Sequence, residues 1–237
     1  MAPRLKSAPA RRPGPKRRSD QIAAAASTRQ ALFGAAAKEF ALHGFAGGSV
    51  DRIAVAARLN KAMIYYHFGS KAGLYAEILH DMFGAVGERV RHIAASDGTP
   101  SEKVRRFVEA IAIEAEARPH FPRIWFREIA DGGKHLADTT TREVAAIVAA
   151  LGEFIRAGVR AGEFVPVPHM LVHAGIVSPL LLFFASRPLR DRMERAGVRG
   201  AAQFDRDQVV RHVQNVTIGI LRGIGDGSRR KGKSRDV

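Results

Sequence analysis

The chain has 237 residues, a net charge of +15, 46% hydrophobic residues and no cysteine. This length allows one or two domains with a substantial core, and the composition is that of a globular protein. The lack of cysteine excludes a disulfide framework, thiol catalysis and a zinc site with cysteine ligands.

Most of the positive charge lies at the two ends of the chain. Residues 1–20 hold seven Lys or Arg and one Asp, and residues 226–237 hold five Lys or Arg and two Asp, so the tails carry nine of the fifteen net charges. Prolines and few large apolar side chains predict a disordered basic arm over residues 1–26, and residues 226–237 are predicted to be a disordered basic tail. The arm could add phosphate or minor-groove contacts, or it could be a solvated tail.

Neither a secretory signal nor a membrane span is expected. The residues before Gln21 contain no apolar stretch. The longest uncharged run, Met170 to Ser186, has 17 residues, whereas a membrane helix needs about 20. We therefore expect a cytoplasmic protein and interpret this run as a buried or interface helix.

The stretch from Ser49 to Lys71 predicts two short helices joined by a tight turn. Ser49 and Asn60 can cap their N-termini, and Ser70 can cap a third helix that begins at Lys71. The gap over residues 58–60 has the length found in a helix-turn-helix. In that motif the second helix lies in the DNA major groove and the first crosses the phosphate backbone.

One helix is predicted before this motif and a long one after it. The first is expected from Ser27 to His43, with Gly44 as its left-handed stop. After Lys71 an apolar residue recurs every four positions as far as Val90, which predicts a helix of about 24 residues, roughly 36 Å long. Such a rod can connect a DNA-binding domain, residues 27–79, to the rest of the chain.

These residues resemble a known family. Gly44-Phe45 and the run SVDRIAVAARLNKAMIYYHFGSKAGL from Ser49 to Leu74 are similar to the TetR family of bacterial transcriptional regulators, whose DNA-binding domain carries an IAxxAGVSxGxxYxxFxSKxxL-like pattern. The likeness covers residues 28–79, and several spaced elements coincide within it. The resemblance implies an N-terminal DNA-binding domain in an all-helical protein.

Three positions depart from the family pattern. Arg58, Asn60 and Ala72 stand where glycine, serine and an acidic residue are common. Asparagine caps a helix as well as serine does. If the turn at Arg58 is left-handed, a residue other than glycine costs on the order of 1 kcal/mol there. The Arg58 guanidinium could offset that strain by reaching a phosphate.

The helix-turn-helix interpretation predicts which side chains meet DNA. Lys61 and Met63 are expected at base edges, and Tyr66 and Lys71 at phosphates. Residues 27–79 carry a net charge of only +3, so we expect specificity to come from placed side chains rather than from bulk charge. The predicted DNA-binding residues are Ser49, Arg52, Lys61, Ala62, Met63, Tyr65, Tyr66, His67 and Lys71.

Residues 80–225 are predicted to form a helical ligand-binding and dimerisation domain. Apolar residues recur at helical spacing beyond Pro100, and no alternating strand pattern appears. Ser101 is expected to cap one helix there, Thr140 with Glu143 another, and Asp205 with Gln208 the last. The amphipathic segment 141–161 and the apolar segment 168–185 are candidates for a dimer interface, with the last helix assisting. Alternatively, segment 168–185 is the core of a monomer. The resemblance implies a homodimer formed through two helices near the C-terminus.

No catalytic, cofactor or metal site is predicted, because the motifs of hydrolases, nucleotide-binding proteins and metalloproteases are absent. His169 and His173 share a helix face, but no third ligand accompanies them. The resemblance implies a small, often apolar effector bound in the C-terminal domain; the alternative is that the aromatic residues there are ordinary packing. The candidate ligand-binding residues are Phe107, Phe121, Trp125, Phe126, Glu128 and His173.

We therefore expect an all-α, sequence-specific transcriptional regulator that binds double-stranded DNA. Our main hypothesis is a homodimeric repressor released from an inverted-repeat operator by a small molecule. An activator or a ligand-independent regulator is one alternative. A non-specific architectural protein that binds DNA through its basic tails is another. The sequence identifies neither the operator nor the effector.

Overall fold

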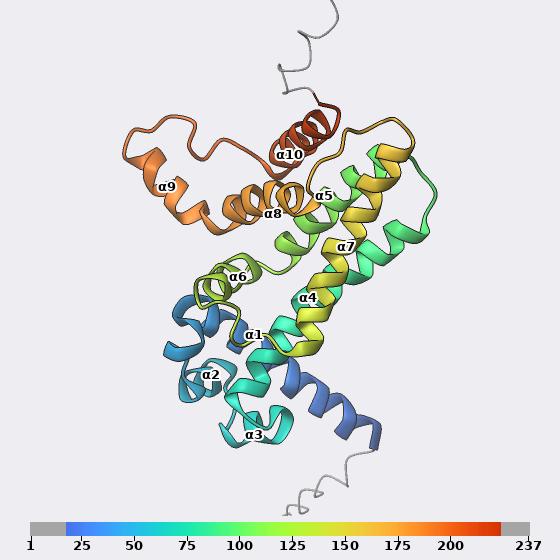
Figure 1. Ribbon diagram of the computed structural model, residues 1–237. Helices are drawn as coiled ribbons and strands as arrows, with labels where there is room; N and C mark the ends of the chain where they lie inside the picture. Colours follow the sequence, from blue (N-terminus) through green and yellow to red (C-terminus); the bar gives the residue numbers. More distant parts are fainter. Residues whose placement is uncertain (1–17, 224–237) are drawn as a thin grey trace, which may run out of the picture.

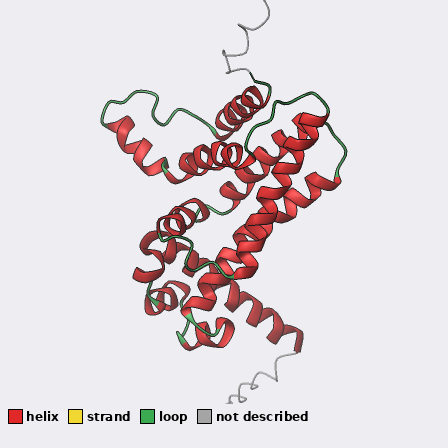
Figure 2. Ribbon diagram, in the orientation of Figure 1, coloured by secondary structure: helices red, strands yellow, loops and turns green. Residues whose placement is uncertain are grey.

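The computed structural model describes residues 18–223 and is helical throughout, with no strand in that range (Figure 1, Figure 2). The predicted all-α class is therefore confirmed. The helices are α1 (Arg18–Gly47), α2 (Val50–Ala57), α3 (Ala62–Phe68), α4 (Lys71–Ala95), α5 (Pro100–Ala117), α6 (Phe121–Ala130), α7 (Asp138–Arg160), α8 (His169–Ala185), α9 (Arg187–Arg195) and α10 (Arg206–Leu221). We call α1–α3 the head and α4–α10 the body.

Helix α1 begins earlier than the sequence suggested. It starts at Arg18 rather than Ser27, so the prediction of a disordered arm is wrong for residues 18–26. Four consecutive alanines precede Ser27, and their high helix propensity outweighs the capping signal of one serine. The remainder of the predicted arm, residues 1–17, and the predicted tail lie outside the described residues. Gly44 interrupts α1 with a φ of 69°, as expected.

The head is a small core closed by the first turn of α4. Three side-chain caps hold its short helices in place, and each was predicted from the sequence. The fully buried residues at its centre are Leu32, Phe40, Ile53, Ile64 and Leu74. The caps are Ser49 Oγ accepting from Arg52 N (3.4 Å), Asn60 Oδ1 from Ala62 N (2.8 Å) and Ser70 Oγ from Gly73 N (2.9 Å). Helix α3 begins at Ala62 rather than at Lys61, so Asn60 lies one residue before its N-cap position.

Helix α4 joins the head to the body, as the four-residue apolar repeat predicted. It runs without a break from Lys71 to Ala95 and packs along α7 and α5 (Figure 1). Its buried face includes the predicted stripe from Leu74 to Val90. One continuous helix of the body therefore packs its first turn against the head.

Two of the predicted caps in the body are wrong. Helix α5 is capped by a Thr99–Glu102 capping box rather than by Ser101, because Pro100 suits the first helical position. Helix α7 has no side-chain cap, and Thr140, the expected cap, is buried inside it. The capping box predicted at the start of α10 is confirmed.

None of the helices within residues 18–223 is, taken singly, both long and apolar enough to cross a membrane. Helices α8 and α9 reach that length and composition only as a pair bent by 59°.

Candidate DNA interface

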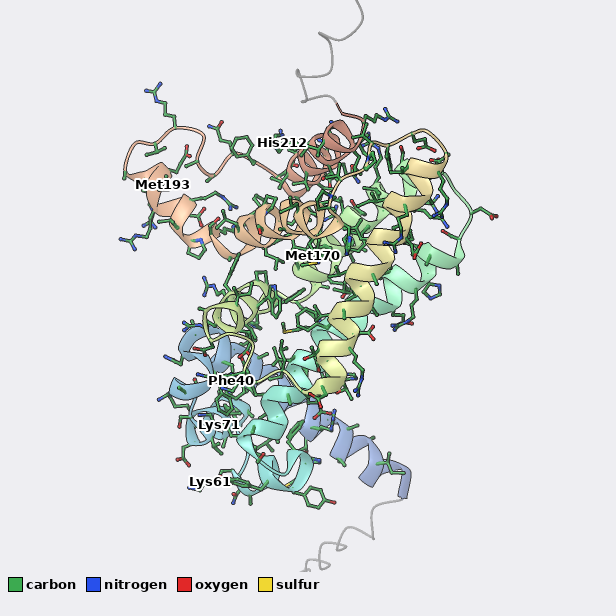
Figure 3. All side chains as sticks on the ribbon, in the orientation of Figure 1. Phe40, Lys61, Lys71, Met170, Met193 and His212 are labelled. Atoms are coloured by element: carbon green, nitrogen blue, oxygen red, sulfur yellow. The ribbon has the colours of Figure 1, made fainter. Side chains whose placement is uncertain are left out.

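Helix α3 presents its polar face at one end of the molecule. Ile64 is fully buried and anchors the helix, whereas Tyr65 and Tyr66 are 51% and 78% exposed. Lys61, just before α3, lies in the head, far from His212 of α10 (Figure 3). The fold therefore leaves both tyrosine rings and the Lys61 side chain exposed to solvent.

The turn between α2 and α3 is left-handed at Arg58, where φ is 56° and ψ is 41°. Among the described residues Arg58 alone combines a positive φ with a side chain. The turn is closed by backbone bonds, with Arg58 N donating to Val55 O and Leu59 N to Ala54 O, both at 3.0 Å. The conformation that favours glycine is thus present, and Arg58 bears its strain.

Helix α2 is fixed to α1 through Glu39, a nearly buried carboxylate. Glu39 Oε1 accepts from Ser49 N at 2.9 Å and from Arg52 Nε at 2.8 Å, and Arg52 Nη2 also donates to Gly47 O at 2.6 Å. Burial disfavours the charged form of Glu39, but the bonds from Arg52 and Ser49 outweigh it and lower the pKa of the carboxyl. Arg52, predicted to contact DNA, therefore orients α2 within the head.

The two lysines predicted to meet DNA have intramolecular partners. Lys61 Nζ lies 3.0 Å from Asp51 Oδ1, and both side chains are exposed. Lys71 Nζ lies 4.7 Å from the centre of the Phe45 ring and donates to Ala46 O at 3.4 Å. An exposed pair such as that of Lys61 contributes little to stability, so a phosphate can replace its carboxylate.

The remaining predicted residues of α3 differ in accessibility. Ala62 is exposed, and Met63 and His67 are half-buried. The His67 ring packs edge-on against Tyr66 at 4.9 Å, and its Nε2 has no hydrogen-bond partner among the described residues. The side chains on the outer face of α3 are thus Ala62, Tyr65 and Tyr66, with Lys61 at its start.

The residues predicted to bind an effector are largely packed. Trp125 and Phe121 make edge-on contacts with Phe83 of α4, at 4.8 and 5.7 Å between ring centres. His173 packs against Phe107 at 6.4 Å, and burial, followed by the nearby His169, lowers its pKa. Phe126 is half-buried against the core. This arrangement matches the alternative interpretation of these side chains as packing.

Glu128, another predicted effector residue, belongs to a buried polar network instead. Its side chain has no exposed surface. Glu128 Oε1 accepts from the Tyr75 hydroxyl of α4 at 2.8 Å and lies 2.8 Å from His135 Nδ1, in the loop after α6. Burial, together with the bond to Glu128, raises the pKa of the Tyr75 phenol, which keeps it a proton donor.

Helix α6 also contacts the head directly, since Arg127 Nη2 donates to the Leu42 carbonyl of α1 at 2.8 Å. Sequence reasoning missed this bond and the roles of Glu39, Tyr75 and His135. For Tyr75 a signal existed, because it lies four positions before Leu79 on the apolar side of α4. For His135, in a glycine-containing loop, no sequence signal was present.

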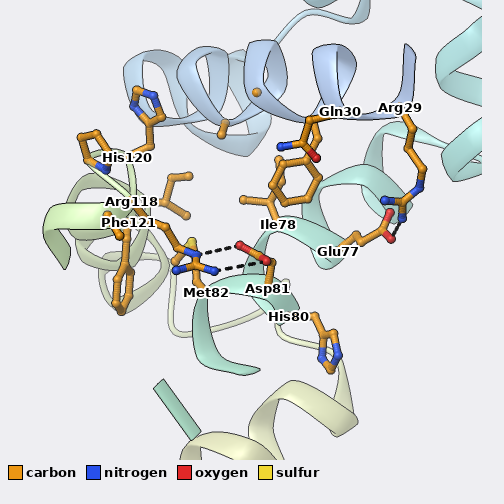
Figure 4. A pocket seen from close by; sticks show the side chains of 16 residues that line it. Arg29, Gln30, Glu77, Ile78, His80, Asp81, Met82, Arg118, His120 and Phe121 are labelled. Atoms are coloured by element: carbon orange, nitrogen blue, oxygen red, sulfur yellow. Dashed lines mark hydrogen bonds and ion pairs between the residues drawn. The ribbon is translucent and has the colours of Figure 1, made fainter. Parts of the chain in front are cut away.

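A pocket of about 590 Å³ lies where the head meets the body (Figure 4). Its apolar lining includes Phe33 of α1, Ile78 and Met82 of α4, and Phe121 and Ile124 of α6. Two ion pairs border it: Arg29 with Glu77, and Arg118 Nε with Asp81 Oδ2 at 2.8 Å. Of the six predicted effector residues, Phe121 lines this pocket and the other five do not.

Comparison with known proteins accounts for both parts of the chain. Residues 32–78 match the family described as bacterial regulatory proteins, tetR family, and residues 100–213 match the tetracyclin repressor-like C-terminal domain. The chain is 32% identical over 102 residues to the HTH-type transcriptional repressor SCO4008 of Streptomyces coelicolor, a match that covers 43% of this chain and 50% of that protein. It is 31% identical over 108 residues to the repressor NicS of Pseudomonas putida, covering 46% of this chain and 51% of NicS.

The chain thus spans about half the length of these curated relatives. Its fold is similar to the crystal structure of the TetR family regulator PfmR from Thermus thermophilus, with a TM-score of 0.61 and 25% identity over 81% of this chain and 94% of PfmR. The motif of α2 and α3, the helical body and these matches agree. The chain belongs to the TetR family of bacterial transcriptional regulators.

Proposed function

We propose that the chain is a sequence-specific repressor that binds an inverted-repeat DNA operator as a homodimer and is released by a small molecule. The observation that carries this proposal is the presentation of Lys61, Tyr65 and Tyr66 by α3, which Ile64 anchors in a rigid head. In a helix-turn-helix this helix enters the major groove. SCO4008 and NicS are themselves named as transcriptional repressors. The proposal assigns the chain no catalytic activity.

DNA footprinting with the full chain tests this proposal. We expect protection of two inverted half-sites, and we expect Lys61→Ala and Tyr66→Ala to weaken that protection without changing the fold. Leu189→Ala, an exposed apolar residue of α9, is the matched control and should bind as the parent does. Protection that both head variants retain in full would refute the role given to α3.

The surface of the body supports dimerisation through α8 and α10. Helix α8 exposes Met170, Leu171 and Leu182, and α10 exposes Val216 and Ile220. The two helices pack against each other. Exposed apolar side chains gathered on neighbouring helices are typical of a protein–protein interface. We therefore place the partner subunit on this surface.

This proposed interface keeps α8 but replaces the predicted segment 141–161, now part of α7, with α10. The apolar stripe of α7, for example Ile147, Leu151 and Ile155, is buried inside the chain where α7 packs on α4 and α5. Helix α10, expected only to assist, carries the exposed side chains instead.

Light scattering on a size-exclusion column tests the interface. The double variant Leu171→Glu, Ile220→Glu should be a monomer, because it places four charges across a two-fold interface. Leu189→Glu, which adds a charge to α9, should remain a dimer. A double variant that still dimerises would place the interface elsewhere.

The pocket between head and body is our candidate effector site. Its walls come from α1 on one side and from α4 and the start of α6 on the other, so an occupant would favour one arrangement of head and body over another. Gly34 lines it, and a Cβ there would meet no atom within 4 Å. The side chain of Gly34→Leu should therefore occupy part of the pocket.

A thermal-shift screen of small amphiphiles, followed by DNA release assays, tests the effector site. We expect a ligand that releases the parent from DNA to lose its effect on Gly34→Leu. Gly84→Leu is the matched control, because Gly84 also has free space and lies outside the pocket. Equal release of both variants would exclude this pocket.

A further inference from the structure

Three side chains at the end of α6 converge on one point. Glu128, Asp131 and His135 each offer a ligand atom, and these atoms lie within 4.8 Å of one another. Glu128 is buried, His135 is half-buried and Asp131 is exposed. We propose that they form a binding site for a divalent transition metal ion, and that the ion controls the joint between head and body.

The local sequence brings the three together. Glu128 and Asp131 are three positions apart at the end of α6 and therefore share a face. Gly132 and Gly133 follow with φ values of 73° and 72°, a left-handed conformation that glycine adopts without strain. Gly133 N donates to Glu128 O at 2.7 Å, which turns the chain back so that His135 meets the Glu128 carboxylate.

The charge of the cluster calls for a cation. Glu128 is fully buried, and among the described residues its one charged neighbour within ion-pair distance is His135. A buried carboxylate without a counter-charge is costly. The carboxylates of Glu128 and Asp131 carry two negative charges, which a divalent ion would balance once Lys134 has turned away from Asp131.

On the solvent side, Lys134 Nζ lies 3.6 Å from Asp131 Oδ1, in a pair whose side chains are both well exposed. Such a pair is weak, and the lysine can turn into solvent when an ion binds. Asp131 thus supplies both a ligand and the side from which an ion enters.

The chemistry of the donors selects the class of ion. One imidazole nitrogen and two carboxylate oxygens suit zinc and similar borderline metals better than magnesium, which prefers oxygen ligands alone. Zinc bonds to such atoms are about 2.0–2.2 Å long, so the three ligand atoms, now within 4.8 Å of one another, would draw closer together around an ion.

The surroundings of the cluster link it to the head. The Tyr75 hydroxyl orients Glu128 from the first turns of α4, as outer hydrogen bonds do for metal ligands. The ring of Phe45, near the end of α1, lies 4.3 Å from the ring of His135. An ion would therefore tie the loop after α6 to α4 and to the end of α1. Because the head is the proposed DNA-binding part, an ion bound here should change the affinity for DNA. That effect rests on the proposed function, whereas metal binding itself does not.

Calorimetry with Zn²⁺ tests the site, using the full chain without a histidine tag. Trp125, the one tryptophan of the chain, lies three residues before Glu128 and reports binding by fluorescence. We expect one ion per chain, and at least about tenfold weaker binding for Asp131→Asn and for His135→Gln. Mg²⁺ should not compete. Asp138→Asn and His80→Gln, exposed residues outside the cluster, are the matched controls and should bind as the parent does.

The absence of saturable binding, or equal binding by parent and cluster variants that circular dichroism shows to be folded, would overturn the site. A gel shift with and without Zn²⁺ then tests the joint: the parent should change its DNA affinity and His135→Gln should not. If zinc binds but leaves the DNA affinity unchanged, the metal site is supported, and the proposal that the ion controls the contact between head and body is refuted. If no DNA is bound at all, the proposed function fails, and the calorimetry still decides on the site.

Discussion

Helices α3 and α6 are both short and both carry two adjacent aromatic residues, yet the fold uses them in opposite ways. In α3 the tyrosines point into solvent, and the single residue Ile64 anchors the helix. In α6 the aromatic rings turn toward α4, and Glu128 is buried. An aromatic pair in the sequence therefore does not by itself mark a binding surface.

The largest effect should follow from breaking the network of α6. Glu128→Ala leaves the Tyr75 hydroxyl and His135 without their buried acceptor, and we expect a loss of about 3 kcal/mol in the free energy of unfolding. Urea denaturation measures it. Glu153→Ala removes an exposed carboxylate of α7 that pairs with Arg156, and it should leave the stability unchanged. Equal stability of Glu128→Ala and the parent would contradict the view that the Glu128 network fixes α6 to α4.

The opposite result is expected for α3. Tyr66→Ala removes an exposed hydroxyl that can donate to a phosphate, a charge-assisted bond worth about 1.5 kcal/mol, or roughly tenfold in DNA affinity. Because Tyr66 is 78% exposed, its unfolding curve should match that of the parent. A variant that loses stability but keeps its DNA affinity would reverse the comparison between α3 and α6.

A smaller effect is expected at the turn before α3. Arg58→Gly relieves the strain of φ 56°, and we expect a gain of up to about 1 kcal/mol in stability. Arg142→Gly, in the exposed face of α7, is the matched control and should lose a similar amount, because glycine is unfavourable inside a helix. If Arg58→Gly also weakens DNA binding, its guanidinium reaches a phosphate. A destabilised Arg58→Gly would show that the turn is not strained.

The smallest effect concerns pH. Burial, followed by the nearby His169, lowers the pKa of His173, so the unfolded chain takes up a proton at a higher pH than the folded one. The stability from this residue is fully present above the ordinary histidine pKa of about 6.5, and it is lost as the pH falls from there through the lowered pKa of the folded state. Urea denaturation between pH 7.5 and 5.5 should show a smaller loss for His173→Leu than for the parent. An equal loss would mean that other groups dominate.

The parts of the fold that could be predicted rest on local interactions. The caps at Ser49, Asn60 and Ser70 and the continuous α4 depend on residues within one or two turns, and all were correct. The predicted start of α1 at Ser27 was wrong, because the helix propensity of the preceding alanines outweighed the capping signal of Ser27. Propensity summed over several residues decided between two local signals there.

The parts of the site that could not be predicted depend on distant neighbours. Tyr75 and Glu128 are 53 positions apart, and no periodicity reveals their bond. The same holds for Arg127 and Leu42, which lie 85 positions apart. The residues chosen as effector contacts were aromatic or charged, but only a three-dimensional arrangement distinguishes a lining residue from a packed one.

The account depends most on α3 reading DNA, and selection of bound sequences from a random DNA pool tests this directly. The full chain should enrich an inverted repeat whose half-sites lie about one helical turn of ~34 Å, or a multiple of it, apart. Lys61→Ala should change or relax the enriched bases. A pool without a motif, or binding that Lys61→Ala and Tyr66→Ala both retain but that is lost when residues 1–20 are removed, would contradict the account and favour a non-specific DNA-binding protein.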